Sequence, residues 1–162
     1  MSDDKSKFEI VFEGRGVASG KMRNDINVRW PGQGEEFQLA TDEGPFHGGD
    51  GTAPPPLALF TAGFIGCIMT QIRAFGKRLN IPVEDLAVSA RMHWKAEQVG
   101  RDPYESAPVG FGFDIEFESS ASEADKIRLV EAAKKGCFID QTLAVSNKVA
   151  HRLKTADGWV DV

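Results

Sequence analysis

The chain has 162 residues, a formal net charge of −5 and 41% hydrophobic residues, which suits one domain spanning residues 1–162. Because Lys and Arg are scattered and the net charge is negative, we expect no nucleic-acid partner. Two cysteines are too few for a disulfide-built fold, and no apolar segment that would mark a secretory signal follows the start Met-Ser-Asp-Asp-Lys. These features favour a cytoplasmic protein with thiols that are reduced at rest.

The N-terminal quarter of the chain has the two-residue periodicity of strands. Apolar side chains recur at alternate positions in residues 8–12 and 22–30, and again at Phe37 and Leu39. These three runs predict an antiparallel meander.

The longest uncharged run, residues 51–72, predicts a helix. Its length approaches the roughly 20 apolar residues of a membrane span. However, Pro54, Pro55 and Pro56 suit only the first turn of a helix, which leaves residues 57–72 before Arg73. Apolar residues lie on several sides of that helix, so we expect a long, central, buried core helix and no membrane partner.

A hairpin and a second helix are predicted after the central helix. Apolar residues alternate in residues 86–96 and 109–117, and residues 99–108 form the polar connection. Ser122 and Asp125 form a capping pattern for a helix through Lys135 that Gly136 stops. We expect Ile127, Val130 and Ala133 to face inward from this helix.

The C-terminal segment predicts shorter elements. Residues 138–145 favour a short helical turn, residues 148–154 a closing strand, and residues 159–162 a tail that docks on the domain. Strands, helix, strands, helix and strand in this order give an α+β fold with antiparallel sheets.

Two segments carry a resemblance to a known family. GGDGTAPPPLALFTAGFIGC ends at Cys67, and KKGCFIDQTLAVS contains Cys137. Together with the order of the elements between them, these segments resemble the OsmC/Ohr family over nearly the whole chain. The resemblance implies an intertwined homodimer, with long helices at its centre and each active site at the subunit interface.

The resemblance also implies roles for the two cysteines. In members that reduce organic hydroperoxides, the first cysteine attacks the peroxide as a thiolate and the second resolves the sulfenic acid to a disulfide, which an external dithiol then reduces. Cys67 resembles the attacking cysteine and Cys137 the resolving cysteine. The alternative is that each cysteine is a small buried apolar residue.

The entry to the central helix departs from the pattern of the peroxidase members. Those members carry a Glu near the helix start and an Arg upstream, whereas this chain has Leu57 and Ala58 at the entry. Arg15 resembles the strand-end Arg of one branch and is the first candidate for the catalytic cation. Arg23 and Arg29 are further candidates, and each of the three could equally be a solvated strand arginine.

Four further residues are candidate substrate-binding residues. Phe60 and Phe64 would line an apolar site on the central helix. Gln71, one turn beyond Cys67, would bond the sulfur or a ligand, or else satisfy a backbone group. His47 would act as a proton acceptor or cation, or else be an exposed loop residue.

Two functional hypotheses remain open. The first is thiol-dependent reduction of apolar organic hydroperoxides by Cys67 and Cys137. The second is a dimer with weak or no peroxidase activity that binds an apolar small molecule or senses oxidants, which the missing Glu favours. No Cys or His pair has metal-ligand spacing and no phosphate-binding loop follows a parallel strand, so we expect no metal and no cofactor.

Overall fold

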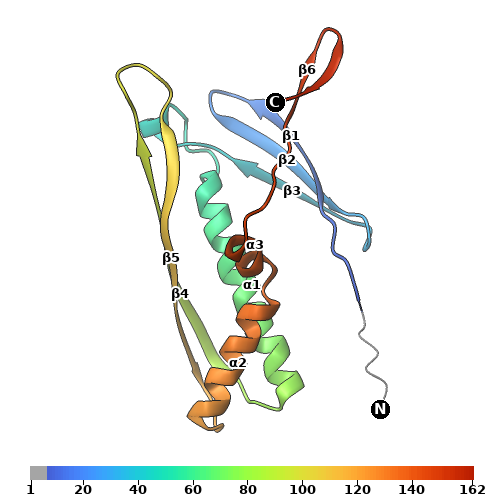
Figure 1. The fold of residues 1–162 in the computed structure, drawn as a ribbon, viewed down its shortest axis with the longest axis vertical. Coiled ribbons are helices and arrows are strands. Elements are labelled where there is room, and N and C mark those ends of the chain that lie inside the picture. The colour runs from blue at the N-terminus through green and yellow to red at the C-terminus, as the bar shows by residue number, and fades with distance from the viewer. Residues whose placement is uncertain (1–6) are drawn as a thin grey trace. The chain divides into compact units, whose positions relative to one another are not determined.

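The computed structural model describes residues 7–162 and has an α+β fold of helices and antiparallel strands (Figure 1). Residues 1–6, which belong to the charged start considered above, lie outside the described part. The chain divides into two compact units, Met1–Phe60 and Thr61–Val162. In chain order the elements are β1 Glu13–Ser19, β2 Arg23–Trp30, β3 Glu35–Thr41, the 3-10 helix η1 Pro45–His47, α1 Pro56–Leu79, β4 Glu84–Glu97, β5 Glu105–Glu118, α2 Glu123–Gly136, α3 Phe138–Ala144, β6 Arg152–Thr155 and β7 Gly158–Asp161.

The first unit contains the predicted antiparallel meander, with strand order β1-β2-β3. The prediction of a strand in residues 8–12 is wrong, because the ladder begins only where Glu13 pairs with Arg29. The Arg29 side chain also bonds the Glu13 carboxylate at 2.7 Å. Phe12 instead contacts Trp30 through its ring, with centroids 5.1 Å apart.

One face of the meander is apolar. Cross-strand partners lie on the same face, so the register places Val28 beside Phe37 and Ile26 beside Leu39. Phe37 and Leu39 are 41% and 47% exposed. This apolar sheet face, formed by Ile26, Val28, Phe37 and Leu39, is therefore only partly covered within the chain.

The loop between β3 and α1 is organised around Asp42, which is 2% exposed. Its carboxylate accepts hydrogen bonds from the Thr52 N–H at 2.9 Å, the Thr52 hydroxyl at 2.8 Å and the Glu43 N–H at 2.9 Å. The bonds from Thr52 lower the pKa of Asp42 most. These bonds tie both ends of the glycine-rich loop together before the chain enters α1.

The helix α1 is longer than the predicted 57–72. It begins at Pro56, the first-turn position expected for a proline, and continues through Lys77 and Arg78. Cations are favourable at the carboxyl end of a helix, so the charged residues extend α1 rather than end it. Asn80, with φ of 53°, follows in the left-handed conformation.

Length and composition alone would allow α1 to cross a membrane, a test that core helices of globular proteins also pass. Only 17% of its most apolar window is buried within the chain. Within one copy of the chain, much of the surface of α1 is therefore uncovered.

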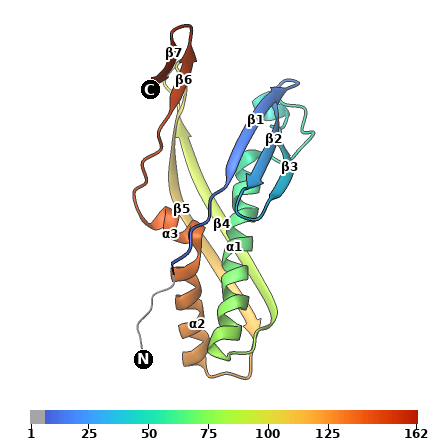
Figure 2. The same ribbon diagram turned by 90° about the vertical axis from the view of Figure 1, so that its right-hand side faces the viewer.

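The core of the second unit lies between α1, α2 and the long β4–β5 hairpin that runs alongside them (Figures 1 and 2). Phe64 packs edge-on against Phe113 of β5, with ring centroids 4.5 Å apart. The strand β5 begins at Glu105, so the predicted connection 99–108 is too long by four residues. The fully buried or nearly buried apolar residues of this core are Phe64, Ile68, Ile72, Ile81, Leu129, Ala133 and Cys137.

The helix α2 begins as predicted. The Ser122 hydroxyl accepts a hydrogen bond from the Asp125 N–H at 3.2 Å and donates one to the Asp125 carboxylate at 2.8 Å. Leu129 and Ala133 face inward and are buried, whereas Ile127 is 59% exposed, contrary to prediction. The inward face thus follows the i, i+4 spacing of Leu129 and Ala133.

The C-terminal residues form a hairpin of β6 and β7 rather than a docking tail. The guanidinium of Arg152 and the ammonium of Lys154 lie 5.4 Å and 5.9 Å from the centre of the Trp159 ring. Backbone pairing with β6 therefore holds residues 158–161 in a strand.

Candidate active site

The structure brings the two cysteines together. Cys67 lies in the middle of α1, and Cys137 lies at the junction of α2 and α3, where it is the N-cap residue of α3. Both thiols are free, and the Cys67 side chain is close enough to raise the pKa of Cys137 through a hydrogen bond and through its charge. Cys137 is 0% exposed and Cys67 is half-buried. The predicted redox pair is thus assembled within one chain.

A stripe of α1 faces the junction of α2 and α3. Its members are spaced four residues apart and so lie along one side of the helix; we call Gly63, Cys67, Gln71 and Phe75 the cysteine stripe. The position of a Cβ on Gly63 would be 3.9 Å from the Ile139 side chain. The stripe therefore meets α3 at one end and the carboxyl end of α2 at the other, with the thiol pair between them.

The environment of Cys137 holds its thiol protonated. Burial is the largest cause, and the hydrogen bond and charge of Cys67 act in the same direction, raising the pKa of Cys137 from 9.0 to about 11. The backbone N–H groups of Asp140 and Ile139 donate to the sulfur and oppose the rise. At neutral pH Cys137 is therefore almost entirely a neutral thiol.

An apolar cavity of ≈ 540 Å³ is lined by residues that flank both cysteines in the chain, although neither cysteine itself lines it. Phe64 and Ile68, the neighbours of the cysteine stripe on α1, form one wall, and β5, α2 and α3 supply the rest. The lining residues are Phe64, Ile68, Phe111, Gly112, Phe113, Ile115, Val130, Lys134, Asp140, Leu143 and Ala144. A cavity of this size and character suits a small, largely apolar molecule.

Two charged residues of this cavity were not predicted from the sequence. Lys134 lies in the last turn of α2, and its carbonyl accepts a hydrogen bond from the Cys137 N–H at 3.4 Å. Asp140 lies in the first turn of α3 and contributes its N–H to the Cys137 sulfur. Their proximity to Cys137 in the sequence was the available signal, but only the helix junction places them around one cavity.

Among the predicted substrate-binding residues, Phe64 and Gln71 belong to this region. Phe64 lines the cavity. Gln71 belongs to the cysteine stripe, and its amide oxygen lies 3.6 Å from where a Cβ of Gly136 would be. Phe60 is half-buried on α1, seven residues before Cys67.

The predicted cations and His47 belong to the first unit. Arg15 is exposed in β1 opposite Asn27. Arg23 bonds Asp25 and Thr52, and Arg29 bonds Glu13. These bonds give Arg23 and Arg29 structural partners, in agreement with the alternative reading of a strand arginine.

The His47 side chain is 55% exposed. Its Nδ1 lies 3.1 Å from the Glu43 carboxylate. This contact provides His47 with a local partner in the loop before α1.

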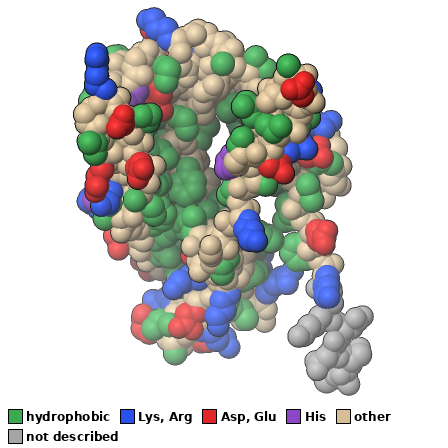
Figure 3. Space-filling view, turned by 45° about the horizontal axis from the view of Figure 1, so that its top comes forward, with side chains coloured by type: hydrophobic (Ala, Val, Ile, Leu, Met, Phe, Trp, Pro, Cys, Tyr) green, Lys and Arg blue, Asp and Glu red, His purple; other side chains and the backbone are tan. Residues whose placement is uncertain are grey.

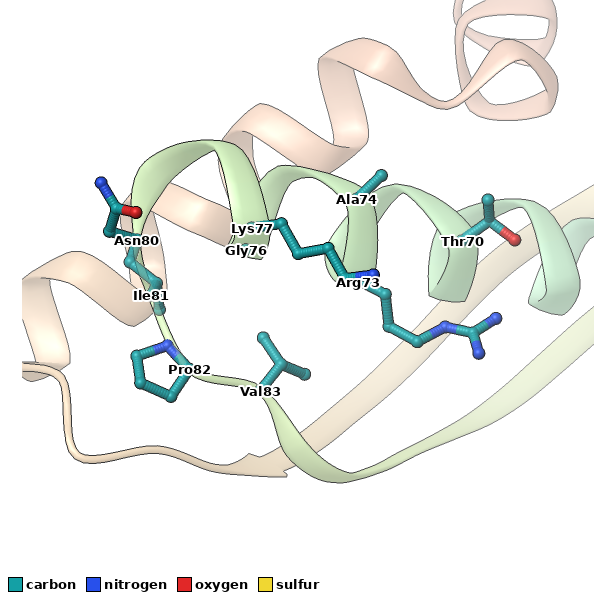
Figure 4. Close-up of a pocket in the computed structure, with 9 residues that line it drawn as sticks. All are labelled: Thr70, Arg73, Ala74, Gly76, Lys77, Asn80, Ile81, Pro82 and Val83. Carbon is teal, nitrogen blue, oxygen red and sulfur yellow. The ribbon is translucent and has the colours of Figure 1, made fainter.

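A larger pocket of ≈ 780 Å³ lies at the carboxyl end of α1 (Figure 4). Figure 4 shows Arg73 and Lys77 on α1 and Pro82 and Val83 on the segment that leads to β4. The residues that line it are Thr70, Arg73, Ala74, Gly76, Lys77, Asn80, Ile81, Pro82 and Val83. Neither Cys67 nor Cys137 lines this pocket.

Residues 7–162 contain no cluster of metal-ligating side chains. No group of three or more His, Cys, Asp or Glu side chains in that range could hold a metal ion. The chemically distinctive feature of the described residues is the thiol pair.

Comparison with known proteins identifies the family of the chain. The family model described as OsmC-like protein matches residues 49–152, a range that contains both cysteines. The chain belongs to the OsmC-like family. None of the curated proteins matches it.

Solved structures of this family share the fold. The chain is 47% identical to an OsmC-like hydroperoxide resistance protein from Jannaschia sp. CCS1, with 94% of this chain and 98% of that chain covered and a TM-score of 0.66. An OsmC-like protein from Mycoplasma pneumoniae is 16% identical, with 86% and 89% covered and a TM-score of 0.61. An organic hydroperoxide resistance protein from Legionella pneumophila is 17% identical, with 86% and 91% covered and a TM-score of 0.53. Membership of this family gives the chain a peroxide-related role in oxidative stress.

Proposed function

We propose that the chain reduces organic hydroperoxides with Cys67 as the attacking thiolate and Cys137 as the resolving thiol. The observation that carries the proposal is the proximity of the two thiols within a single chain, where Cys67 raises the pKa of Cys137. Two cysteines that are already neighbours in the fold can form a disulfide with little movement of the backbone. The 47% identity to an OsmC-like hydroperoxide resistance protein supports hydroperoxides as the substrate class.

The different environments of the two thiols support the assignment of their roles. A thiolate, not a thiol, attacks a peroxide. Cys137 is fully buried and has a pKa raised to about 11, so it is a poor first nucleophile. Cys67 is only half-buried, which leaves part of its side chain accessible to a substrate.

In the first step, the Cys67 thiolate attacks the terminal oxygen of the hydroperoxide. A sulfur–oxygen bond forms, the oxygen–oxygen bond breaks, and the alkoxide leaves and takes a proton from water to become an alcohol. Cys67 is oxidised to a sulfenic acid, and the hydroperoxide is reduced by two electrons.

In the second step, the Cys137 sulfur attacks the sulfur of the Cys67 sulfenic acid. The disulfide bond forms as the sulfur–oxygen bond breaks, and the hydroxide leaves with the thiol proton of Cys137 as water. Conversion of Cys67 to a neutral sulfenic acid removes the negative charge that contributes to the raised pKa of Cys137. The first step thereby makes Cys137 easier to deprotonate for the second.

An external dithiol completes the cycle. Two exchange reactions transfer its two electrons to the disulfide, returning Cys67 and Cys137 to thiols and leaving the reductant as a disulfide. The apolar cavity beside the thiols favours a hydroperoxide with a bulky apolar group over hydrogen peroxide.

A second copy of the chain is part of the proposal. Leu57 at the start of α1 is 52% exposed, and the apolar sheet face defined above is partly uncovered. Hydrophobic side chains also occur on the face of the molecule drawn in Figure 3. Burial of these surfaces would stabilise a homodimer.

One observation supports the alternative function. The first turn of α1 has no acidic residue. A chain without that carboxylate would retain the ≈ 540 Å³ cavity and bind an apolar small molecule or sense oxidants with weak or no turnover.

The test is to treat the reduced protein with one equivalent of cumene hydroperoxide. The proposal requires loss of both free thiols, formation of one disulfide within the chain, and release of one equivalent of cumyl alcohol. Two results together would favour the alternative instead. Both thiols would stay free after prolonged exposure to the hydroperoxide, and cumyl alcohol added separately as a probe would bind to the protein. An assay with dithiothreitol as the external dithiol then measures turnover.

A further inference from the structure

Gly136 makes an unusually close contact with α1. It is the last residue of α2 and immediately precedes Cys137. A Cβ built on Gly136 would lie 2.5 Å from both Cε2 and Cζ of Phe75. Real Cβ atoms essentially never approach other heavy atoms within 3.0 Å, so the ring tip of Phe75 occupies the space of a side chain at position 136.

The need for glycine at this position is one of space. Gly136 is not among the glycines with positive φ, so its backbone conformation is open to other residues. Even alanine, however, would require either the Phe75 ring or the end of α2 to move. The ring stands on α1, where χ1 is restricted to two rotamers, so the clash is relieved by rotation about χ2, by a shift of the ring within its rotamer, or by movement of the end of α2.

The contact lies next to the thiol pair. Phe75 and Cys67 both belong to the cysteine stripe, and Gly136 and Cys137 are consecutive residues. A displacement of the backbone at Gly136 is therefore passed directly to the Cys137 sulfur. Disulfide formation tolerates only a narrow range of Cβ–Cβ distances, roughly 3.5–4.5 Å.

We infer that Gly136 is a positioning residue for the disulfide step. By allowing the Phe75 ring to pack against bare backbone, it holds the Cys137 sulfur in reach of Cys67. The inference rests on the proposed function and deepens it, because it concerns the second step and not the attack on the peroxide. A misplacement of about 1 Å can slow a positioned reaction by roughly a hundredfold.

The experiment separates the two steps in four proteins: wild type, Gly136→Ala, Phe75→Leu and the double variant. After one equivalent of cumene hydroperoxide, a dimedone probe reports the Cys67 sulfenic acid and mass spectrometry of unreduced protein reports the disulfide. Gly136→Ala is expected to form the sulfenic acid at the wild-type rate and the disulfide at least about tenfold more slowly. Sulfenic acid should therefore accumulate in this variant.

Leucine at position 75 lacks the two ring atoms that crowd position 136, which provides the decisive comparison. In the Phe75→Leu background, Gly136→Ala is expected to leave the disulfide rate within about threefold. A disulfide rate in Gly136→Ala equal to that of wild type would overturn the inference, and so would a full loss of rate that Phe75→Leu does not relieve. If Gly136→Ala fails to fold, the disulfide rate of the double variant is compared with that of Phe75→Leu alone. Folding of the double variant with a rate within about threefold supports the inference, and a large loss of rate overturns it.

Gly110→Ala is the control, because a Cβ at Gly110 meets nothing within 4 Å.

A second oxidant keeps this inference distinct from the proposed function. Diamide takes two electrons and two protons from a pair of thiols and becomes a hydrazine, so it forms the disulfide without any peroxide. A wild type that forms the disulfide with diamide but not with hydroperoxide would contradict the proposed function while the four-protein comparison, repeated with diamide, still tests Gly136.

Discussion

The thiols of Cys67 and Cys137 interact although Cys67 lies on α1 and Cys137 lies at the junction of α2 and α3, with the whole β4–β5 hairpin between them in the chain. One thiol is fully buried and the other is half-buried. This asymmetry gives each thiol a distinct expected chemistry.

Substitution of each cysteine tests the two roles. Cys67→Ser is expected to abolish peroxide consumption, because the nucleophile is lost. Cys137→Ser is expected to consume one equivalent of hydroperoxide and to stop as a Cys67 sulfenic acid, because the resolving thiol is lost. Peroxide assays with dimedone trapping measure both results. Unchanged peroxide consumption in both variants would reduce the cysteines to packing residues.

The raised pKa of Cys137 predicts a loss of stability at alkaline pH. Because the folded protein holds the thiol proton more tightly than the unfolded chain, the stabilisation is complete below about pH 9 and is lost as pH rises toward 11. The free energy of unfolding of the reduced protein should fall by about 1–3 kcal/mol more over this interval than that of Cys137→Ala. Urea unfolding at several pH values measures the difference. Parallel pH profiles for the two proteins would contradict it.

The apolar cavity predicts selectivity between peroxides. Leu143 lines the cavity and is 42% exposed, so Leu143→Ser changes the wall at little expected cost in stability. We expect kcat/KM to fall about tenfold for cumene hydroperoxide and to stay unchanged for hydrogen peroxide, because only the former has an apolar group to bury. Leu153→Ser in β6, outside the cavity lining, is the control. An equal fall in kcat/KM for both peroxides would show that the cavity does not bind the apolar group of the substrate.

The uncovered apolar surfaces predict a dimer. Light scattering at micromolar concentration should give twice the 17.7 kDa mass of the chain. Phe37→Lys together with Leu39→Lys on the apolar sheet face should shift the mass toward that of one chain, whereas Glu36→Lys together with Gln38→Lys on the opposite face should not. A stable 17.7 kDa species for the wild-type protein would contradict the dimer proposal.

The local elements followed from the sequence where short-range patterns decide structure. The Ser122–Asp125 cap fixed the start of α2, and proline fixed the start of α1 at Pro56. The alternation in residues 8–12 misled, because periodicity reports a face and not the presence of a partner strand. The end of α1 was placed too early for a similar reason, since charge does not by itself end a helix.

By itself the sequence determined the α+β order of elements and the two thiols as the chemically distinctive residues, because both follow from local pattern and residue type. Only the tertiary structure decided that the thiols are neighbours, that Cys137 is the buried member, and that Lys134 and Asp140 line one nearby cavity. It also revealed that Phe75 fills the space beside Gly136. These relationships depend on how α1 packs against the junction of α2 and α3, and contacts between residues about seventy positions apart have no local signature in the chain.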